Sequence, residues 1–427
     1  MGTSGARLTL DVVKPAAGGR MLARHDGQVI LVSGAIPGER VVALVERVGK
    51  GVSFADVVEV LAPSADRRPA AADWRCGGQV LSHIAYPRQL ALKGEIVADA
   101  FGRIARLPLA NPPTMLGSPE HGYRMRARMH VREGRLGFYR EGTHEVCDVA
   151  PSGQLLPETA AWVSDVPRRL TAAHLAGLTD IEVAESVDGG QRVCHLTLGP
   201  GATPSLYEPL AEGLTGLIAQ PPERGAPAVV WGCGTIVERF GGDAVAGPPP
   251  LELTRHPRSF FQGNRFLLAP LVRRVLEAVG DGPLLDLYAG VGLFGLSATA
   301  AGMGLVTLVE GDPQSASDLE VNAAPWRPTA RAMRQDVESF LASRAPAGRV
   351  NTVIVDPPRT GLSREATAGL CRLGSPVVVY VSCDVATLAR DARALIDGGY
   401  GLDTLLGLDL FPNTAHVESV AVFRRQA

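Results

Sequence analysis

A cysteine and a glutamate near the C-terminal end of the chain have the side chains needed for nucleophilic and proton-transfer chemistry. Cys383 follows the apolar stretch Val377–Ser382, and Glu418 opens a second apolar stretch. A thiolate can add to an electron-poor ring carbon, and a carboxylate sheltered from water can accept a proton. Together they suit the methylation of carbon 5 of a pyrimidine, which is too weakly nucleophilic to react without covalent activation.

The expected reaction passes through a covalent adduct. The Cys383 thiolate would add to carbon 6 of uracil, carbon 5 would take a methyl group, and Glu418 would remove the carbon 5 proton before the thiolate leaves. The alternative is a buried, inert cysteine, which is the usual role of a cysteine at the end of a strand. Its polar neighbour Asp384 and its place at the carboxyl edge of a predicted sheet favour the catalytic interpretation.

The segment Leu284–Gly295 predicts a cofactor site, because it reads as a buried strand, a glycine turn and the start of a helix. Gly290 and the glycines after it let the backbone approach a ligand. Glu310 ends the next predicted strand and would bind ribose hydroxyls, Asp336 ends the third and would bind the adenine amine, and Asp356 ends the fourth. Each acid alone would more often be a cap or loop residue. Together they repel a pyrophosphate and attract a cationic sulfonium, so S-adenosylmethionine fits better than NAD.

From Phe260 onward, predicted strands alternate with helices, which is typical of a parallel sheet covered on both faces. The expected fold class of this part is α/β, as a doubly wound, Rossmann-like domain with seven strands. These strands are Pro283–Tyr288, Gly304–Glu310, Ala330–Gln335, Thr352–Asp356, Val377–Ser382, Gly401–Leu410 and Glu418–Arg424.

The N-terminal part alternates apolar and polar residues between turns rich in glycine, which predicts a small five-stranded β-barrel. The clearest strands are Leu8–Val13, Gln28–Val32, Arg40–Val45 and Phe54–Val60. Such a barrel is either a structural addition or an oligonucleotide-binding module that grips RNA. The run Ala35–Glu39, followed by an alternating strand, resembles a TRAM domain.

The central part mixes periodicities, with a helix expected at Pro87–Ala105 and strands at Arg124–Val131 and Arg192–Leu198. In a strand, Arg124, Arg126 and Arg128 would project from one face and suit contacts to RNA phosphates, although solvated surface arginines are the alternative. The proline-rich run Gly247–Pro250 is the expected linker. The predicted domains are therefore a barrel over 1–64, a central α+β RNA-recognition domain over 65–250 and a catalytic domain over 251–427.

These motifs resemble the RNA (uracil-5-)-methyltransferase family over essentially the whole chain. The family's Phe-Phe-Gln segment is matched by Phe260–Gln262, its glycine motif by Asp286–Gly292, and its fourth-strand Asp-Pro-Pro-Arg by Asp356–Arg359. The resemblance implies the class I methyltransferase fold. In that fold the last strand runs antiparallel to the others, which would bring Glu418 to the edge of the sheet where Cys383 emerges.

The resemblance also implies roles for the matched residues. Gln262 would contact the methionine end of S-adenosylmethionine, and Tyr288 would contact the cofactor. Glu310 would bind its ribose, while Asp356 would line both cofactor and base. Cys383 would be the nucleophile and Glu418 the proton acceptor.

The chain departs from the family at one place. Many members carry an iron–sulfur cluster on four cysteines, but here the corresponding run is Cys76–Gln79, Ala70 stands near the place of the first cysteine and Ser152 near that of the last. Two thiolates would be too few for such a cluster even with Cys147 as a displaced ligand. We therefore expect no iron–sulfur cluster and no other metal, with Cys76 a remnant of the four-cysteine pattern.

Rival functions use parts of the same pattern. An RNA-binding protein without catalysis would keep the barrel and the arginines but would not need Cys383 and Glu418. An amino-directed base methyltransferase would carry an aromatic residue where this chain has Arg359. A DNA cytosine enzyme would carry its cysteine beside Pro357-Pro358, where none occurs.

Composition limits the setting in which this chemistry would occur. The chain has 427 residues and a formal net charge of −2, and its six cysteines are too scattered for a disulfide framework. There is no apolar run of about eighteen residues, and Met1–Leu10 lacks the apolar core of a signal peptide. We expect a cytoplasmic monomer without membrane contact. Its RNA substrate, ribosomal RNA rather than transfer RNA, would be held by a local basic patch.

Overall fold

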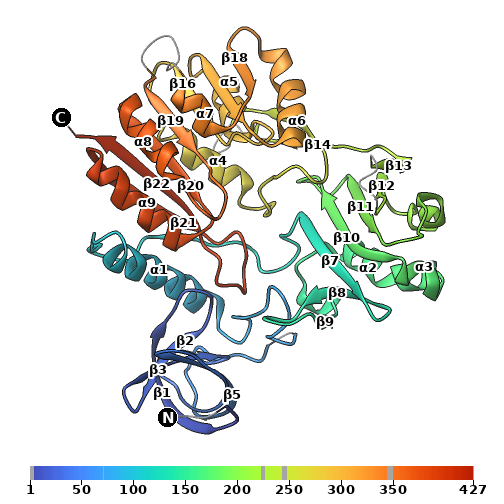
Figure 1. The fold of residues 1–427 in the computed structure, drawn as a ribbon, viewed down its shortest axis with the longest axis vertical. Coiled ribbons are helices and arrows are strands. Elements are labelled where there is room, and N and C mark those ends of the chain that lie inside the picture. Colours follow the sequence, from blue (N-terminus) through green and yellow to red (C-terminus); the bar gives the residue numbers. More distant parts are fainter. Residues whose placement is uncertain (1–3, 71, 223–226, 243–247, 344–349, 427) are drawn as a thin grey trace.

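The computed structural model describes residues 4–70, 72–222, 227–242, 248–343 and 350–426. Within these residues the strands form a closed five-stranded barrel, a seven-stranded sheet, an eight-stranded sheet and a two-stranded sheet. The barrel lies at one end of the molecule, and the two large sheets lie beside each other above it (Figure 1). Gly247 of the expected linker lies outside the described residues.

The N-terminal part confirms the predicted five-stranded barrel and adds β2 to the four strands identified from the sequence. The five strands are β1 (Arg7–Pro15), β2 (Met21–His25), β3 (Gln28–Ser33), β4 (Arg40–Val48) and β5 (Val52–Ala62), closed in the order β1-β2-β3-β5-β4. Alternate residues of β1, among them Leu8, Leu10 and Val12, fill the interior, as a half-buried strand requires. The turn before β4 is held by Glu39, whose carboxylate accepts hydrogen bonds from the backbone of Ile36 at 2.9 Å and Ser64 at 3.0 Å.

The seven-stranded sheet forms the middle of the chain, in the order β13-β12-β11-β10-β7-β8-β9. Its strands are β7 (Arg126–Arg132), β8 (Arg135–Tyr139), β9 (Val146–Cys147), β10 (Leu178–Glu185), β11 (Arg192–Leu198), β12 (Gly216–Gln220) and β13 (Ala228–Gly232). Helices α2 (Pro157–Arg169) and α3 (Ala172–Ala176) cover one face, and Trp162 and Val166 of α2 share a buried cluster with Met129 and Ile181 of the sheet. A short ribbon of β14 (Ile236–Phe240) and β15 (Leu251–Arg255) follows.

The eight-stranded sheet confirms the doubly wound α/β fold. Its order is β18-β17-β16-β19-β20-β22-β21-β6, with β16 (Leu284–Leu287), β17 (Val306–Glu310), β18 (Ala330–Arg334), β19 (Thr352–Val355), β20 (Val377–Ser382), β21 (Tyr400–Leu408), β22 (Glu418–Arg425) and β6 (Met115–Leu116). Helices α4 (Leu268–Leu276), α5 (Leu293–Ala300) and α6 (Pro313–Ala323) cover one face; α7 (Val337–Ala342), α8 (Arg364–Leu373) and α9 (Val385–Asp397) cover the other. The first seven strands in this order match the seven predicted ones.

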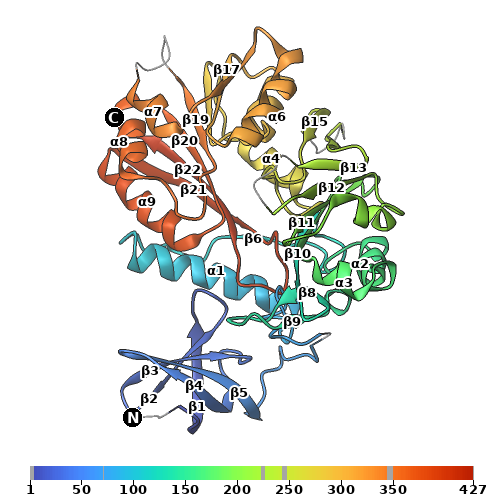
Figure 2. The ribbon, with the colours of Figure 1, turned by 45° about the vertical axis from the view of Figure 1, so that its right-hand side comes forward.

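Helix α1 (Tyr86–Arg103) and strand β6 come from the segment predicted to be central, yet both pack on the C-terminal sheet. Strand β6 runs parallel to β21, and Val97 and Phe101 of α1 lie in a buried cluster under that sheet. Leu92 on the same helix belongs to the barrel core. Helix α1 therefore lies between the barrel and the C-terminal sheet, as Figures 1 and 2 show. The boundaries at residues 64 and 250 stay a prediction.

A buried network joins α1 to the loop between β21 and β22, which comprises residues 409–417. Lys93 and Asp409 form an ion pair in which both side chains have no exposed surface. One turn earlier on α1, the Gln89 amide donates to Asn413 Oδ1 at 2.9 Å and its oxygen accepts from the Asn413 backbone at 3.0 Å. The loop that precedes Glu418 is thus fixed by a helix from another part of the chain.

None of the helices in the described part of the chain combines the length and the hydropathy that crossing a bilayer demands.

Replacing Lys93 with methionine is expected to lower the free energy of unfolding by about 3–5 kcal/mol, because Asp409 would be left as an unpaired buried charge. Urea denaturation followed by circular dichroism measures this loss. The double variant Lys93→Met with Asp409→Leu should recover most of it. Lys14→Met, which breaks the exposed pair with Asp99, is the control and should cost less than about 1 kcal/mol. Equal losses for Lys93→Met and Lys14→Met would contradict the role given to the buried pair.

Candidate active site

Cys383 and Glu418 meet at one edge of the eight-stranded sheet. Strands β20 and β22 are antiparallel, with Ser382 opposite Ser419. The residue after β20 and the first residue of β22 therefore lie side by side. Glu418 is 3% exposed, and Cys383 is half-buried. This is the edge at which the parallel strands end, where ligands bind in open α/β sheets.

The carboxylates at this edge lie in an environment that disfavours their charged forms. Burial raises the pKa of Glu418 well above its usual range, and the nearby Asp356 raises it further, while Arg359 opposes the shift. Burial also raises the pKa of Asp356 to about 7, against the effect of Gln262, whose Nε2 donates to Asp356 Oδ2 at 3.1 Å. Gln262, Asp356 and Glu418 thus form one cluster, and a carboxylate so weakly solvated is a stronger base than one in water.

The Cys383 thiol is held largely protonated in this structure. Burial raises its pKa to about 11, and the charges of Glu418 and Asp356 contribute to the increase. Arg359 acts in the opposite direction, through its charge and a hydrogen bond to the thiol. Sequence reasoning had used Arg359 to match the family's fourth-strand motif and to exclude another enzyme class, but gave it no role at the thiol; its place directly after Asp356-Pro357-Pro358 was the available signal.

A second buried group of acids lies at the glycine turn after β16. The Gly295 backbone donates to Asp286 Oδ2 at 2.8 Å, while Oδ1 has no hydrogen-bond partner among the described residues. Burial raises the pKa of Asp286 to about 8, and Asp356 and Glu310 add to the effect. Glu310 accepts from the Gly290 backbone at 2.7 Å. The acids at positions 286, 310 and 356 therefore influence one another across the strand ends.

The glycine turn leaves room for a ligand. Gly290 has a φ of 57°, which favours glycine, and a Cβ built there would have only the Phe260 carbonyl oxygen near it, at 3.9 Å. Backbone that is open to solvent, beside buried carboxylates with an unpartnered oxygen, fits a cofactor that carries a sugar and a positive charge.

The other two residues predicted to bind the cofactor lie at the border of this group. Asp336 caps α7, with its carboxylate accepting from the Ser339 backbone at 2.8 Å, and its Cα lies near Gly311, directly after Glu310. Tyr288, at a φ of 59°, lines a groove of 890 Å³ with Glu338 and Asp391 on the α7–α9 face of the sheet. The structure therefore brings Asp336 next to Glu310, and turns the Tyr288 ring toward α7 and α9.

The arginine row is shorter than predicted. Arg126 and Arg128 lie on the polar face of β7, but β7 begins at Arg126 and Arg124 precedes it. The Arg124 side chain is half-buried, donates to Gln154 Oε1 at 2.6 Å and lies over the Phe138 ring. Arg126 pairs with Glu182 and Arg128 with Asp180. An RNA contact by these arginines stays a prediction, and each already has a protein partner.

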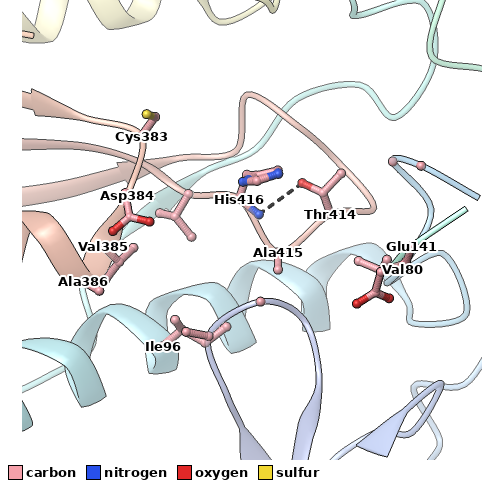
Figure 3. Close-up of a pocket in the computed structure, with 15 residues that line it drawn as sticks. Val80, Ile96, Glu141, Cys383, Asp384, Val385, Ala386, Thr414, Ala415 and His416 are labelled. Carbon is pink, nitrogen blue, oxygen red and sulfur yellow. Dashed lines mark hydrogen bonds between the residues drawn. The ribbon is translucent and has the colours of Figure 1, made fainter. Parts of the chain in front are cut away.

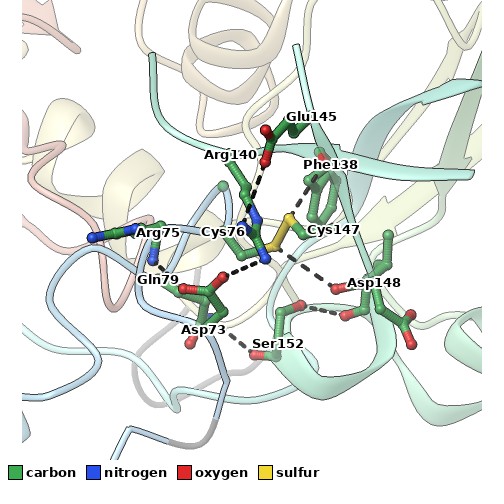
Figure 4. The surroundings of a disulfide bond; sticks show 12 residues. Asp73, Arg75, Cys76, Gln79, Phe138, Arg140, Glu145, Cys147, Asp148 and Ser152 are labelled. Carbon is green, nitrogen blue, oxygen red and sulfur yellow. Dashed lines mark hydrogen bonds and ion pairs between the residues drawn. A yellow bond between two sulfur atoms is a disulfide. The ribbon is translucent and has the colours of Figure 1, made fainter. Parts of the chain in front are cut away.

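Cys76 is not an unpaired remnant, because it forms a disulfide with Cys147 (Figure 4). The Cα atoms are 5.9 Å apart, although the residues are separated by 71 positions. Gln79 and Ser152, which stand near family cysteine positions, lie beside the disulfide, and Gln79 Nε2 donates to the Ser152 carbonyl at 3.1 Å. The residues present do not fit an iron–sulfur cluster, since an amide and a hydroxyl replace thiolates.

The disulfide predicts the number of thiols that react with iodoacetamide in denatured protein. We expect label on the four free cysteines without reductant and on all six after reduction, counted by intact mass. Cys76→Ser should add one label in the unreduced sample, because it frees Cys147, whereas Cys233→Ser should remove one. Purified protein with stoichiometric iron and sulfide and a broad visible band would contradict both the pairing and the expected absence of a cluster.

The raised pKa of Cys383 predicts a steep pH dependence of its alkylation in folded protein. Only the thiolate reacts, so the rate should rise about tenfold per pH unit between about pH 7 and 10. Peptide-resolved mass spectrometry would separate it from Cys233, whose pKa is lowered by hydrogen bonds involving Thr235. Arg359→Gln should slow Cys383 labelling about tenfold at fixed pH, and Arg393→Gln on α9 should not. A flat profile, or no effect of Arg359→Gln, would contradict this account of the thiol.

Two family models match the chain. The model described as tRNA (Uracil-5-)-methyltransferase matches residues 344–426, and the TRAM domain model matches residues 3–58. The second match covers most of the five-stranded barrel.

Full-length relatives and a solved structure resemble the chain from end to end. An uncharacterized RNA methyltransferase of Streptomyces coelicolor is 32% identical over 99% of this chain and 94% of its own length. The 23S rRNA (uracil(1939)-C(5))-methyltransferase RlmD of Pseudomonas putida is 31% identical over 98% of this chain and 94% of its own length. The crystal structure of Pyrococcus abyssi tRNA (uracil-54, C5)-methyltransferase in complex with S-adenosyl-L-homocysteine has a TM-score of 0.75 at 23% identity, covering 97% and 99% of the two chains, and shows the same fold. With these matches beside the site described above, the chain belongs to the family of S-adenosylmethionine-dependent RNA (uracil-5-)-methyltransferases and carries a TRAM domain at its N-terminal end.

Proposed function

We propose that this protein methylates carbon 5 of a uridine in ribosomal RNA, through a covalent adduct between Cys383 and carbon 6 of the base. The observation that carries the proposal is the edge shared by a thiol and a buried carboxylate, Cys383 and Glu418. Methylation at this carbon needs both groups on one substrate ring, because one must activate the carbon and the other must remove its proton.

The residues at the glycine turn are proposed to hold S-adenosylmethionine, which supplies an electrophilic methyl group when bound. Glu310 accepts hydrogen bonds from the ribose, Gly290 lets the backbone approach it, and Asp336 binds the adenine amine. Tyr288 contacts the cofactor through its backbone at the start of the glycine turn, because its ring faces α7 and α9, and Gln262 binds the methionine end of the cofactor. The buried acids favour a positively charged ligand over an anionic one such as a dinucleotide.

Cys383 and Glu418 act in sequence on the uracil. The Cys383 thiolate forms a bond to carbon 6, and the electron pair of the 5,6 double bond moves toward carbon 5 and the carbonyl at carbon 4. Arg359 stabilises the thiolate before attack. Once carbon 5 carries the methyl group, Glu418 takes the proton from that carbon, the double bond re-forms and the carbon–sulfur bond breaks. The raised pKa of Glu418 suits this last step.

Ribosomal RNA is proposed as the substrate because full-length relatives bear that activity in their names. The RlmD proteins of Pseudomonas putida and of Chromohalobacter salexigens, the latter 33% identical over 97% of this chain, are both named 23S rRNA methyltransferases. The structural neighbour from Pyrococcus abyssi is named for a tRNA uridine, so tRNA is the alternative that the experiment must separate.

Cells that lack this gene are expected to lose 5-methyluridine from ribosomal RNA but not from transfer RNA, measured by mass spectrometry of nucleosides from each pool. Wild-type protein and the exposed-cysteine variant Cys233→Ser should restore the nucleoside, whereas Cys383→Ala should not. Purified Glu418→Gln should accumulate a denaturation-stable protein–RNA adduct, because it forms the bond to carbon 6 but cannot complete elimination.

Each contrary result has a defined meaning. Restoration by Cys383→Ala would refute the covalent mechanism. Loss of 5-methyluridine from transfer RNA alone would make tRNA the substrate. An unchanged nucleoside content in both pools, with RNA binding retained, would favour an RNA-binding protein without catalysis or a methyltransferase that acts on another position of the base.

A further inference from the structure

A pocket of 350 Å³ has Cys383 among its lining residues and lies between separate parts of the chain. The barrel contributes the loop Ala17–Gly18, the disulfide segment contributes Gly77–Gly78, and α1 contributes Ile96. The 409–417 loop contributes His416, whose ring lies between Cys383 and the α1 side of the pocket in Figure 3. Residues of the barrel and of the sheet edge thus line the same cavity.

His416 offers hydrogen-bonding atoms to an occupant of this pocket. His416 is exposed, yet the protein around its ring desolvates it and lowers its pKa to about 4, and the charges of Arg359 and Lys93 lower it further, so the ring is neutral at physiological pH. A neutral imidazole has one donor and one acceptor nitrogen. The ring lies edge-on to the Phe411 ring, at 6.0 Å between centroids, and neither ring nitrogen has a hydrogen-bond partner among the described residues.

The lining favours an uncharged, flat ligand over a phosphate. No lysine or arginine lines the pocket, and its charged members are the acids Glu141 and Asp384. Glycine backbone at Gly77–Gly78 and small apolar side chains form the remaining walls, which can lie against the face of an aromatic ring. A nucleobase has such a face, together with donor and acceptor atoms on its edge.

The occupant differs from the uridine that is methylated. That uridine must reach both Cys383 and Glu418, and Glu418 is buried and does not line the pocket. Cys383 and the barrel loop both line the pocket, so a nucleotide next to a uridine held at Cys383 can reach it. A neighbouring nucleotide is the part of the substrate that this position can receive.

We infer that the pocket is a subsite for the base of a nucleotide adjacent to the target uridine, with His416 hydrogen-bonded to its edge. The inference rests on the proposed function, because it takes RNA as the substrate. It makes His416 a specificity-determining residue and gives the barrel loop a direct part in choosing the uridine. A base in this pocket would also fix the direction in which the RNA strand runs past Cys383.

The test is a thermodynamic cycle between protein and RNA. Short single-stranded RNAs with a central 5-fluorouridine would carry a base or an abasic residue at each flanking position, and dissociation constants would be measured for wild type and His416→Ala. We expect one flanking abasic residue to weaken wild-type binding about tenfold, as a lost base contact does. The His416→Ala variant should bind the intact RNA about tenfold more weakly than wild type does. An abasic residue at that same position should weaken its binding little further.

Two further variants keep the outcome clear. Ala17→Leu fills the pocket from the barrel side and should weaken binding of the intact RNA but not of the abasic RNA, and His174→Ala on α3 is the matched control without effect. The subsite is refuted if every abasic position weakens RNA binding by wild type and by His416→Ala by the same factor, or if no RNA binds measurably. Formation of the Cys383 adduct with 5-fluorouridine tests the proposed function separately, so an adduct without coupling refutes only the subsite.

Discussion

The buried ion pair between Lys93 and Asp409 is the interaction on which the geometry of the site depends. Burial lowers the pKa of Lys93, and Asp409 opposes that shift. Each charge would be costly alone, so the helix and the loop must fold together. Lys93 also donates to the Phe411 carbonyl at 3.2 Å, and Arg68 reaches Asn413 from the segment after the barrel. Glu418 therefore gains its position from residues that lie outside its own sheet.

The burial of the acidic groups, which prepares the site, also lowers the folding stability of the protein. The folded-state pKa values of Asp286 and Asp356 are raised to about 8 and about 7, so the native state holds these protons more tightly than the unfolded chain. Their contribution to stability is greatest below the unfolded pKa near 4 and is lost as pH rises toward 7 and 8. The site therefore keeps its carboxyl groups and its thiol mostly protonated, at a cost in stability. These groups act as base and nucleophile when substrate and Arg359 favour their charged forms.

Local sequence patterns predicted the N-terminal barrel and the C-terminal sheet, but of the seven-stranded central sheet they identified only β7 and β11. Alternation identified the barrel, and buried runs identified the seven strands from β16 to β22, because a strand covered on both faces must be apolar throughout. Strand β6 was missed, since two residues carry no periodic signal and its pairing with β21 depends on a distant partner. Arg124 was assigned to a strand by its spacing, but it precedes β7 and its side chain contacts Gln154 and Phe138, contacts that spacing does not encode.

The types and order of the chemical groups were determined by the sequence alone: a thiol after a strand, a carboxylate opening the last strand, and acids beside a glycine turn. Tertiary structure decided how these groups act. It set Arg359 against the thiol, paired Cys76 with Cys147 across the fold, and placed His416 in a pocket completed by the barrel. Charge, burial and disulfide pairing depend on distances between residues far apart in the chain, and only the packed chain fixes those distances.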